Sequence, residues 1–373
     1  MPEATTLIVI VIRLPMRHIP GPLAYGACAA LAVPLLWAFS TPVQAQAPRP
    51  LGRPAEFALD QWTTEHGLPQ NSVNALALSP EGYLWIGTFG GLARFDGMRF
   101  TPVERTDEAG RHIDRILALA MAPDSALWIG TETGLLRRKH QRYQVFTRRN
   151  GLPDDEVRAL FVDRMGVVWI GTGAGGLSWL KHGQLHTVQQ VAGRRVAEVS
   201  RITGAADGTI WVNTAAGVLR VPHGDAGSIQ WHAGAGSGTS YLQDDTDGST
   251  WFGQNGRTLR RTANGAVETA PVAGSIMVGD SEAGYWVGTI NDGAFLLRPD
   301  ADGIAVQQYP LPEGPKGYRV RSMLVDQDGS VWLGTNASGL LRARRNLFTT
   351  YTSAHGLSHD VATAVFADRR GTV

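Results

Sequence analysis

A tryptophan-centred motif recurs seven times along the chain, and this recurrence constrains the fold more than any other feature. The first copy, YLWIGTFGGLARFDG, spans residues 83–97, and a glycine pair and a second apolar run follow its Trp-Ile-Gly-Thr core. The seven tryptophans are Trp85, Trp128, Trp169, Trp211, Trp251, Trp286 and Trp332. Successive tryptophans are 43, 41, 42, 40, 35 and 46 residues apart. Such a period is typical of repeat proteins, in which one unit cannot bury a core alone and neighbouring units stack.

The first copy predicts the structure of one unit. Apolar runs of strand length occupy residues 73–79, 83–89, 92–96 and 99–104, and turn-forming residues separate them. Four short strands in a unit that repeats at this period are typical of a β-propeller blade. We therefore expect an all-β chain that forms a seven-bladed propeller of four-stranded blades.

The turn before each tryptophan has a composition of its own. Glycine lies three residues ahead in five copies: Gly82, Gly166, Gly208, Gly248 and Gly329. Aspartate lies six residues ahead in four copies: Asp163, Asp245, Asp280 and Asp326. Because aspartate bonds the turn backbone and glycine tolerates positive φ, this pattern predicts a hairpin. The Asp-x-Asp-Gly form at 245–248 and 326–329 also resembles the start of a calcium loop, but the distal acidic ligand is missing, so we expect no metal site.

Residues 16–45 have the order of a secretory signal peptide. A basic residue at Arg17 precedes a largely apolar stretch over 22–39, and Val43-Gln44-Ala45 has the small residues of a cleavage site. We expect cleavage after Ala45, translation from Met1 or from Met16, and a linker over 46–56. An uncleaved anchor is the alternative, although Pro34 argues against a membrane span. The mature domain is then periplasmic.

The bulk composition excludes several classes of function. Lys and Arg together number 34, against 33 Asp and Glu, so the balance gives no reason to expect a nucleic-acid or anionic-membrane partner. The single cysteine, Cys28, lies in the expected signal peptide, which leaves the mature domain without disulfides. No nucleophile elbow, metal-ligand spacing or phosphate-binding glycine loop is present. We therefore expect no catalytic residues, no metal and no cofactor.

The run HGLPQNSVNALALSPEGYLWIGTFGGLARFDG, residues 66–97, resembles the two-component regulator propeller repeat. The resemblance extends over about residues 57–373 and is clearest in copies one, two, three and seven. Copies four to six depart from it, with Asn213 in place of the glycine after Trp211 and Gln254 in place of the threonine after Trp251.

The resemblance implies a function as a sensor. Such repeats form the periplasmic input region of hybrid histidine kinases and diguanylate cyclases, usually as two propellers, a β-sandwich, one membrane span and a cytoplasmic output domain. The chain has no second apolar span, kinase nucleotide box or GGDEF sequence. It is therefore expected to be an input half that binds a small-molecule or oligosaccharide ligand. In a full-length receptor it would be anchored in the inner membrane and would form a homodimer. The mature chain itself would have no membrane span.

Both ends of the repeat region carry related sequences. FALDQWTTEHGL at 57–68 parallels FTTYTSAHGL at 348–357. We expect the strand at 57–62 to complete blade seven and so to close a propeller over 57–347. Residues 348–373 would then be the truncated first blade of a second propeller.

Ligands of propellers usually bind near the axis, on the loops that lead into the innermost strands. These positions hold polar and charged residues, namely Asn71, Asn74, Asp114, Arg115, Asp155, Arg158, Glu198, Arg201, Arg319 and Arg321. Such a ring suits hydroxyl-rich or anionic ligands, and the alternative for each residue is a solvated loop position.

Trp179 is a further candidate because four other copies have arginine at this position, at Arg94, Arg137, Arg220 and Arg342. Trp231 and Tyr241 also lie outside the repeat. Each aromatic would either stack on a sugar or partner, or pack against the next blade.

Three functions remain open at this point. The first is the ligand-binding sensor, the second a secreted propeller lyase, and the third an envelope scaffold for protein interactions. The absence of a histidine-centred acid/base pair disfavours the lyase.

Overall fold

The computed structural model describes residues 57–103, 106, 110, 112–232, 239–245, 247–280, 284–300, 303–309, 319–345 and 353. The expected signal peptide and the linker over 46–56 lie outside this set, as does nearly all of the expected second propeller. Within the described residues, regular helical structure is limited to four short 3₁₀ turns. They are η1 (Thr64–His66), η2 (Arg148–Asn150), η3 (Pro222–Gly224) and η4 (Ala226–Ser228).

Seven four-stranded antiparallel sheets form the blades, as the repeat predicts. Blade 1 comprises β2 (Val73–Leu78), β3 (Leu84–Thr88), β4 (Gly91–Phe95) and β5 (Phe100–Pro102). Blade 2 comprises β6 (Ile116–Met121), β7 (Leu127–Thr131), β8 (Gly134–Lys139) and β9 (Arg142–Phe146). Blade 3 comprises β10 (Val157–Val162), β11 (Val168–Thr172), β12 (Leu177–Lys181) and β13 (Gln184–Val188). Blade 4 comprises β16 (Val199–Gly204), β17 (Ile210–Thr214), β18 (Gly217–Val221) and β19 (Gln230–Trp231).

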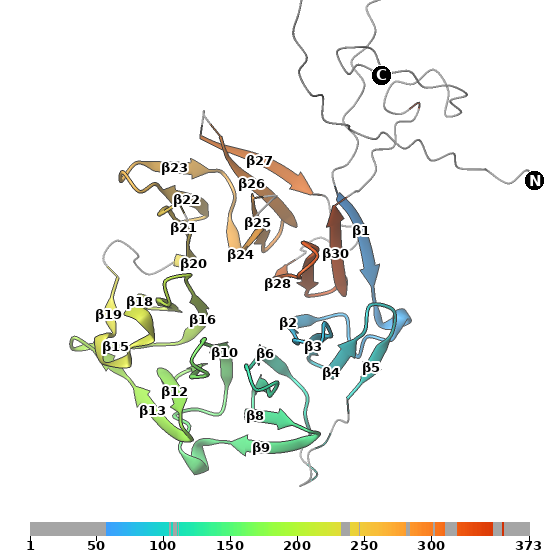
Figure 1. Cartoon of the computed structure of the whole chain (residues 1–373), viewed down its shortest axis with the longest axis vertical. Coiled ribbons are helices and arrows are strands. Elements are labelled where there is room, and N and C mark those ends of the chain that lie inside the picture. Colours follow the sequence, from blue (N-terminus) through green and yellow to red (C-terminus); the bar gives the residue numbers. More distant parts are fainter. Residues whose placement is uncertain are drawn as a thin grey trace, which may run out of the picture. The chain divides into compact units, whose positions relative to one another are not determined.

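The remaining blades follow the same order. Blade 5 comprises β20 (Thr239–Asp244), β21 (Thr250–Gln254), β22 (Arg257–Arg261) and β23 (Val267–Ala270). Blade 6 comprises β24 (Gly274–Asp280), β25 (Gly284–Thr289), β26 (Ala294–Asp300) and β27 (Gly303–Tyr309). Blade 7 comprises β28 (Val320–Val325), β29 (Val331–Thr335), β30 (Leu340–Arg345) and β1 (Phe57–Trp62). A two-stranded hairpin, β14 (Gln190–Val191) and β15 (Arg194–Arg195), lies between blades 3 and 4. Residues 59–344 form one compact unit, and their blades surround a central axis (Figure 1).

The first strand of the chain closes the ring. β1 pairs with β30 and supplies the outermost strand of blade 7, which is the closure expected for residues 57–62. The Trp62 ring stacks on the Trp332 ring, with centroids 5.5 Å apart, and Asp60 forms an ion pair of 2.9 Å with Arg342. Because the first and last strands share one sheet, the ring cannot open without breaking a strand pairing.

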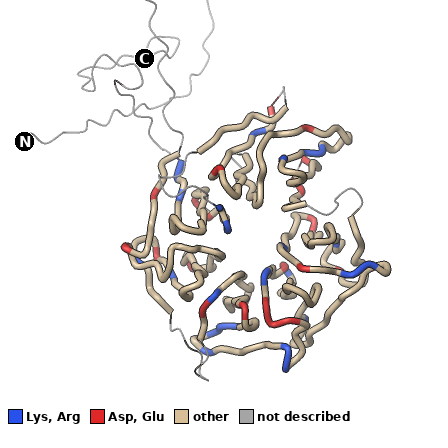
Figure 2. Tube along the Cα trace, turned by 180° about the vertical axis from the view of Figure 1, so that it is seen from behind, with Lys and Arg blue, Asp and Glu red and all other residues tan. Residues whose placement is uncertain are grey.

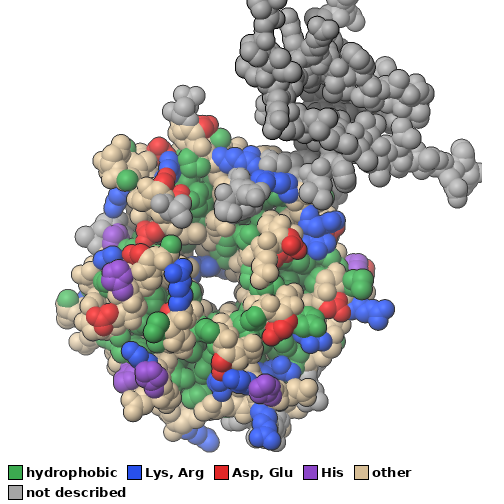
Figure 3. All heavy atoms as spheres, in the orientation of Figure 1, with side chains coloured by type: hydrophobic (Ala, Val, Ile, Leu, Met, Phe, Trp, Pro, Cys, Tyr) green, Lys and Arg blue, Asp and Glu red, His purple; other side chains and the backbone are tan. Residues whose placement is uncertain are grey.

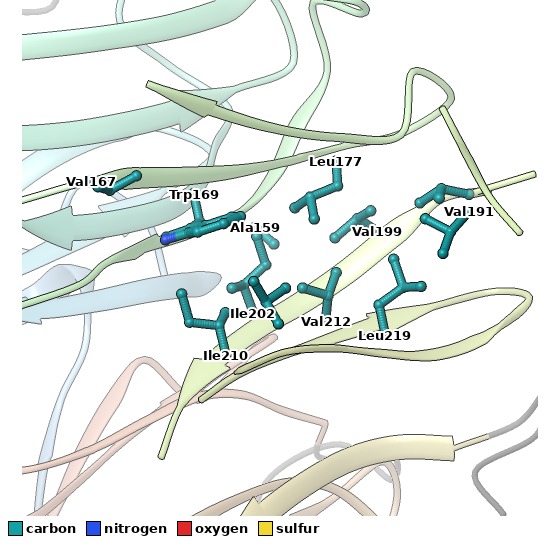
Figure 4. Close-up of a cluster of buried hydrophobic side chains, with 12 residues drawn as sticks. Ala159, Val167, Trp169, Leu177, Val191, Val199, Ile202, Ile210, Val212 and Leu219 are labelled. Atoms are coloured by element: carbon teal, nitrogen blue, oxygen red, sulfur yellow. The ribbon is translucent and has the colours of Figure 1, made fainter. Parts of the chain in front are cut away.

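Neighbouring blades bury a continuous apolar core between their faces. Between blades 3 and 4, Trp169 and Leu177 pack against Val199, Val212 and Leu219 (Figure 4). Trp169 is completely buried there. The tryptophan of the repeat therefore supplies a large apolar surface to the contact between blades, which one sheet alone cannot cover.

In six of the seven copies a glycine lies two residues after the tryptophan, and it allows the next blade to approach. A Cβ atom on Gly171 would lie 2.4 Å from Cγ1 of Val199, the first residue of the next innermost strand. A residue with a Cβ atom would therefore fit at this position only if one of the two strands shifted. Blade 4 instead has Asn213, whose Nδ2 donates to the Thr239 carbonyl at 3.3 Å.

The aspartate six residues before the tryptophan has two roles. In blade 7, Asp326 Oδ1 accepts from the amides of Asp328 and Ser330 at 3.0 and 2.9 Å, which holds the hairpin turn. Its Oδ2 accepts from the Trp332 indole at 2.7 Å. Gly329 has φ 74°, as the turn requires. The carboxylate is thus already occupied by the fold, and the hairpin explanation of this pattern is confirmed.

The threonine of the repeat fastens the following turn. Thr88 Oγ1 donates to the Gly91 carbonyl at 2.8 Å and accepts from the Gly90 amide at 3.1 Å. The equivalent threonines of five further blades accept from a turn amide and bond the carbonyl in the same way, namely Thr131, Thr172, Thr214, Thr289 and Thr335. Lys and Arg residues and Asp and Glu residues are dispersed around the ring (Figure 2).

Candidate functional site

The innermost strands all begin at one face of the ring, which we call the mouth face. The turns between the second and third strands of each blade lie at the same face, since the sheets are antiparallel. The ring has a central opening, with hydrophobic and basic side chains at its rim (Figure 3). Loops at this face place side chains of different blades around the opening, which suits ligand binding.

A β-bulge at the start of every innermost strand sets the direction of the candidate side chains. In each blade, the second residue of that strand has no register partner. These bulge residues are Asn74, Leu117, Arg158, Ser200, Ser240, Ser275 and Arg321. Bulges re-aim side chains out of the sheet pattern. Four bulge residues contact the next blade. Two of them donate to a backbone carbonyl: Asn74 Nδ2 to Ile116 at 2.9 Å and Ser240 Oγ to Gly274 at 2.7 Å. The other two are arginines, of which Arg158 pairs with Glu198 and Arg321 stacks on Phe89.

Arg115 is held by a carboxylate and an aromatic ring. Its Nη2 donates to Glu132 Oε1 at 2.7 Å, and its Nε pairs with the other carboxylate oxygen. Its Cζ lies 5.1 Å from the centroid of the Phe89 ring. Hydrogen bonding to Glu132 raises the pKa of Arg115. This guanidinium therefore has its charge balanced within the protein.

Arg158 is paired twice. Its guanidinium lies 2.9 Å from Glu156 and also forms an ion pair with Glu198 of blade 4. The hydrogen bond to Glu156 raises the pKa of Arg158, while burial acts against this increase. The structure thus brings the candidates Arg158 and Glu198 together as a pair that bridges two blades.

Arg319 and Arg321 differ from these two arginines. The backbone of Arg319 exchanges hydrogen bonds with Asn336, both 3.1 Å long, and its side chain is exposed. The Arg321 Cζ lies 5.5 Å from the Phe89 ring centroid, and its Nε is buried without a hydrogen-bond partner. Burial, followed by the nearby Arg319, lowers the pKa of Arg321. Among the residues described, neither guanidinium has a carboxylate within ion-pair distance.

Arg201 lies at a position that alanine occupies in blades 1 to 3. It pairs in register with Asn213, so both side chains face blade 5. Although part of the residue is exposed, burial lowers the pKa of Arg201 to about 10. The Asn213 Oδ1 is also buried without a partner within the described part of the chain. Arg201 and Asn213, the two residues by which blade 4 departs from the repeat, therefore both lie at the contact between blades 4 and 5.

Three candidates serve local structure or have no contact that assigns a role. Asn71 Oδ1 accepts from the Thr64 amide at 2.8 Å, and Asp155 Oδ1 accepts from the Arg148 amide at 2.6 Å. These bonds hold the loops that precede the innermost strands. Asp114 is exposed and shows only a charge interaction with Arg115.

The aromatic candidates pack within the blades. Trp179 pairs in register with Trp169, at a ring distance of 5.7 Å, and stacks on His186 at 5.5 Å. Trp231 donates its indole N–H to the Val191 carbonyl at 2.9 Å. Tyr241 is 2% exposed and bonds Thr258 through its hydroxyl. These contacts favour packing over ligand stacking, and for Tyr241 burial excludes the latter.

The arginines that Trp179 replaces have a structural role that the sequence did not reveal. Arg137, Arg220 and Arg342 lie opposite the repeat tryptophan on the neighbouring strand, with Cζ 5.8, 5.8 and 5.1 Å from its ring centroid. They cover the outer part of the indole and keep the cation in water. In blade 3, a second indole covers the first.

A groove that sequence reasoning missed lies on the face opposite the mouth, between blades 2 and 3. Its volume is about 490 Å³, and Trp128, Arg137, Met165 and His182 contribute to its walls. No motif indicated this groove, because its walls come from turns and from the outer ends of two sheets.

The described residues contain no group of three or more His, Cys, Asp or Glu side chains placed to hold a metal ion. A search of the same residues for a helix long and apolar enough to cross a membrane finds none.

The family model described as two component regulator propeller matches residues 67–90, 151–174 and 314–337. Three of the seven repeats therefore match this family. The matched ranges fall in copies one, three and seven, which are three of the four copies where the sequence resemblance is clearest. A comparison with curated proteins gives no significant match.

Several solved structures share the propeller. One is the extracellular domain of a protein described as the hybrid two component system BT3049 from B. thetaiotaomicron, with 18% identity, 78% of this chain and 42% of that chain covered, and a TM-score of 0.65. Another is the extracellular domain of a protein described as the hybrid two component system BT4673 from the same organism. It has 19% identity, with 80% of this chain and 44% of that chain covered, and a TM-score of 0.58. A catalytically inactive virginiamycin B lyase from Staphylococcus aureus with quinupristin has 14% identity, 78% and 100% coverage and a TM-score of 0.61. The chain spans less than half of the two extracellular domains, and at these identities the likeness shows the fold alone.

Proposed function

We propose that this chain is a ligand-binding sensor domain that acts outside the cytoplasm, as the input part of a bacterial two-component histidine kinase or diguanylate cyclase. The observation that carries the proposal is the family match over three separate copies, because repeats of this description are named for two component regulators. The structural likeness to extracellular domains of hybrid two component systems supports the same role.

The ligand would bind at the mouth face. Bulge residues from several blades converge there. One of them, Arg321, and the neighbouring loop residue Arg319 carry charges that no described carboxylate balances. A small organic molecule or an oligosaccharide fits such a surface, since hydroxyl groups bind the amide and carboxylate groups of the rim, while an anionic group binds an arginine.

The structural likeness to a lyase raises a second candidate, a secreted lyase. Lyase chemistry requires a positioned acid or base. Within the described chain, no histidine lies in an innermost strand. Three carboxylates of the mouth face, Glu132, Glu156 and Glu198, are engaged by arginines. The sensor role is therefore favoured, and we propose that the chain is not itself an enzyme.

The test combines binding with turnover. The purified chain is titrated with panels of oligosaccharides, sugar acids and organic acids in calorimetry, and each mixture is then assayed chromatographically for loss of the compound. Saturable binding with the compound recovered unchanged supports the sensor. Consumption of any panel member, or of a streptogramin B antibiotic tested in parallel, contradicts it and supports the lyase.

A further inference from the structure

The ring closure between blades 7 and 1 contains an arginine whose surroundings are incomplete. Arg321 occupies the bulge of β28, between Val320 and Ser322, which are 2% and 7% exposed. Ser322 Oγ donates to the Val73 carbonyl of blade 1 at 3.4 Å, so this part of the strand is fixed against the next blade. The Arg321 side chain is thus placed by a rigid backbone and not by a long loop.

Phe89 fixes the guanidinium from one side. The same ring contacts Arg115, which Glu132 holds through two hydrogen bonds. The Glu132–Arg115–Phe89 chain therefore anchors the ring against which Arg321 stacks. A cation–π contact engages the face of the guanidinium and leaves the N–H donors at its edge unused.

Those unused donors distinguish Arg321 from its structural equivalents. Asn74 and Ser240, at the same position of other blades, both donate to a carbonyl of the next blade. Arg158, the equivalent in blade 3, has two carboxylates. Arg321 has a buried Nε without an acceptor, and the exposed cation of Arg319 lies close enough to lower its pKa. Because an unpaired buried donor is costly, an oxyanion at this point would remove a deficit already present in the folded protein.

We propose that Arg319 and Arg321 form a subsite for a single oxyanion group, such as a carboxylate, sulfate or phosphate, carried by a small ligand at the mouth face. The inference rests on the proposed sensing function and names the chemical class of its ligand. A guanidinium presents parallel N–H donors that match the two oxygens of such a group.

The rest of the rim limits the ligand to low charge. Acidic side chains line the mouth face of blades 2 to 4, namely Asp114, Glu132, Asp154, Asp155, Glu156 and Glu198. Arginines pair with Glu132, Glu156 and Glu198. Asp114, Asp154 and Asp155 form no ion pair within the described residues, so their charges oppose a polyanion that spans the opening. The remainder of the ligand is accordingly neutral and polar, and a sugar acid or hydroxy acid has this composition.

The experiment observes Arg321 directly. Proton–nitrogen spectra of arginine Nε–H groups are recorded on the full chain, and the Arg321 signal is identified by its loss in Arg321→Gln. Sodium acetate, sulfate and phosphate are titrated against sodium chloride at equal ionic strength. We expect a saturable shift of the Arg321 signal with at least one oxyanion at millimolar concentration and only a small, linear response to chloride.

Variants separate the subsite from general charge effects. Arg94→Gln is the matched control, because Arg94 also stacks on an aromatic ring, Tyr83, at 4.3 Å, but lies in the third strand of blade 1. The Arg94→Gln variant should bind the responding oxyanion with the same affinity as the parent chain. Arg321→Lys retains the charge without the guanidinium fork, and it should weaken binding of the responding anion at least tenfold in calorimetry. That measurement applies even if Arg321→Gln does not fold.

The outcomes distinguish this inference from the proposed function. If the Arg321 signal responds identically to all three oxyanions and to chloride, the subsite is overturned. Saturable binding of neutral oligosaccharides would in that case still support the sensor role. Saturable oxyanion binding at Arg321 supports the subsite even if turnover assays identify the chain as a lyase.

Discussion

Replacing Gly171 with alanine tests whether the repeat glycine exists for contact between blades. The new Cβ would lie 2.4 Å from Val199 Cγ1, 2.8 Å from Val199 Cβ and 3.0 Å from Ala159 Cβ. Carbon atoms prefer about 3.5–4.0 Å, so the two strands must separate or the valine must rotate. Overpacking of this kind costs about 1–3 kcal/mol.

A second effect acts in the opposite direction. Gly171 does not have a positive φ, so alanine is compatible with its backbone. Such a substitution stabilises by about 0.4–1 kcal/mol because it restricts the unfolded chain. We therefore expect a net loss of about 1–2 kcal/mol, and a domain of this size loses about 2–4 °C in melting temperature per kcal/mol. Thermal and urea unfolding of the purified chain measure both quantities.

A double-mutant cycle assigns the clash to its partner. Val199→Ala alone should destabilise the protein, since Val199 is completely buried. In the double variant the new methyl group enters the space that valine vacated, so its loss should be smaller than the sum by at least about 0.5 kcal/mol. Gly227→Ala is the control, because its nearest contact would be an ordinary 3.4 Å from Asp225 Oδ1. Additive losses in the cycle, or a Gly171→Ala variant as stable as the parent, would refute this reasoning.

Three further predictions follow from other contacts. Asp326→Ala should lower the free energy of unfolding by about 1–3 kcal/mol, because it leaves the Trp332 indole N–H buried without an acceptor; unchanged urea denaturation would contradict this. Burial raises the pKa of Asp60, but hydrogen bonds from two β30 arginines outweigh burial and bring it below its ordinary value of 3.8. The stability that depends on Asp60 is therefore present above this value and lost as the pH falls through the lower, folded-state pKa. Thermal melts from pH 7 to pH 2.5 should show Asp60→Asn less stable at pH 7 and a difference that narrows in acid; a constant difference would count against the ion pair. Residues 1–45 fused to a reporter should direct export, with Edman sequencing starting directly after Ala45; a start before residue 40 would contradict the cleavage site.

The scaffold was predictable because the same residues solve the same packing problem in every blade. The number of blades, the four strands of each and the ring closure by residues 57–62 all follow from the spacing of the tryptophans and from the related ends. The hairpin role of Asp163 was visible in one sequence because seven copies served as an internal comparison. The role of Gly171 in the contact between blades became clear only from the structure. The bounds differ by one or two residues, since strand ends depend on turn hydrogen bonds that composition indicates only approximately.

The candidate site was less predictable. Position in the repeat put Arg158 and Glu198 among the mouth-face candidates, because they begin or precede an innermost strand, but it did not indicate that the two side chains pair. It could not indicate that Asp155 holds a loop or that Trp179 covers another tryptophan, since these outcomes depend on which neighbour a side chain reaches. The bulge, which re-aims the second residue of each innermost strand, has no sequence signature among residues as different as Asn74, Leu117 and Arg321.

Equivalent positions of the ring provide a control that few proteins offer. The backbone around Arg321 matches that around Asn74 and Ser240, and at those positions the same bulge yields a complete hydrogen bond to the next blade. The fold therefore does not require an unsatisfied donor at this site. In most proteins an unpaired buried group has no internal standard, and imperfect packing explains it as well as function does. In this ring Ser240 shows that the position can be satisfied by a short side chain, so the long cation at blade 7 needs another reason, and a bound anion supplies one.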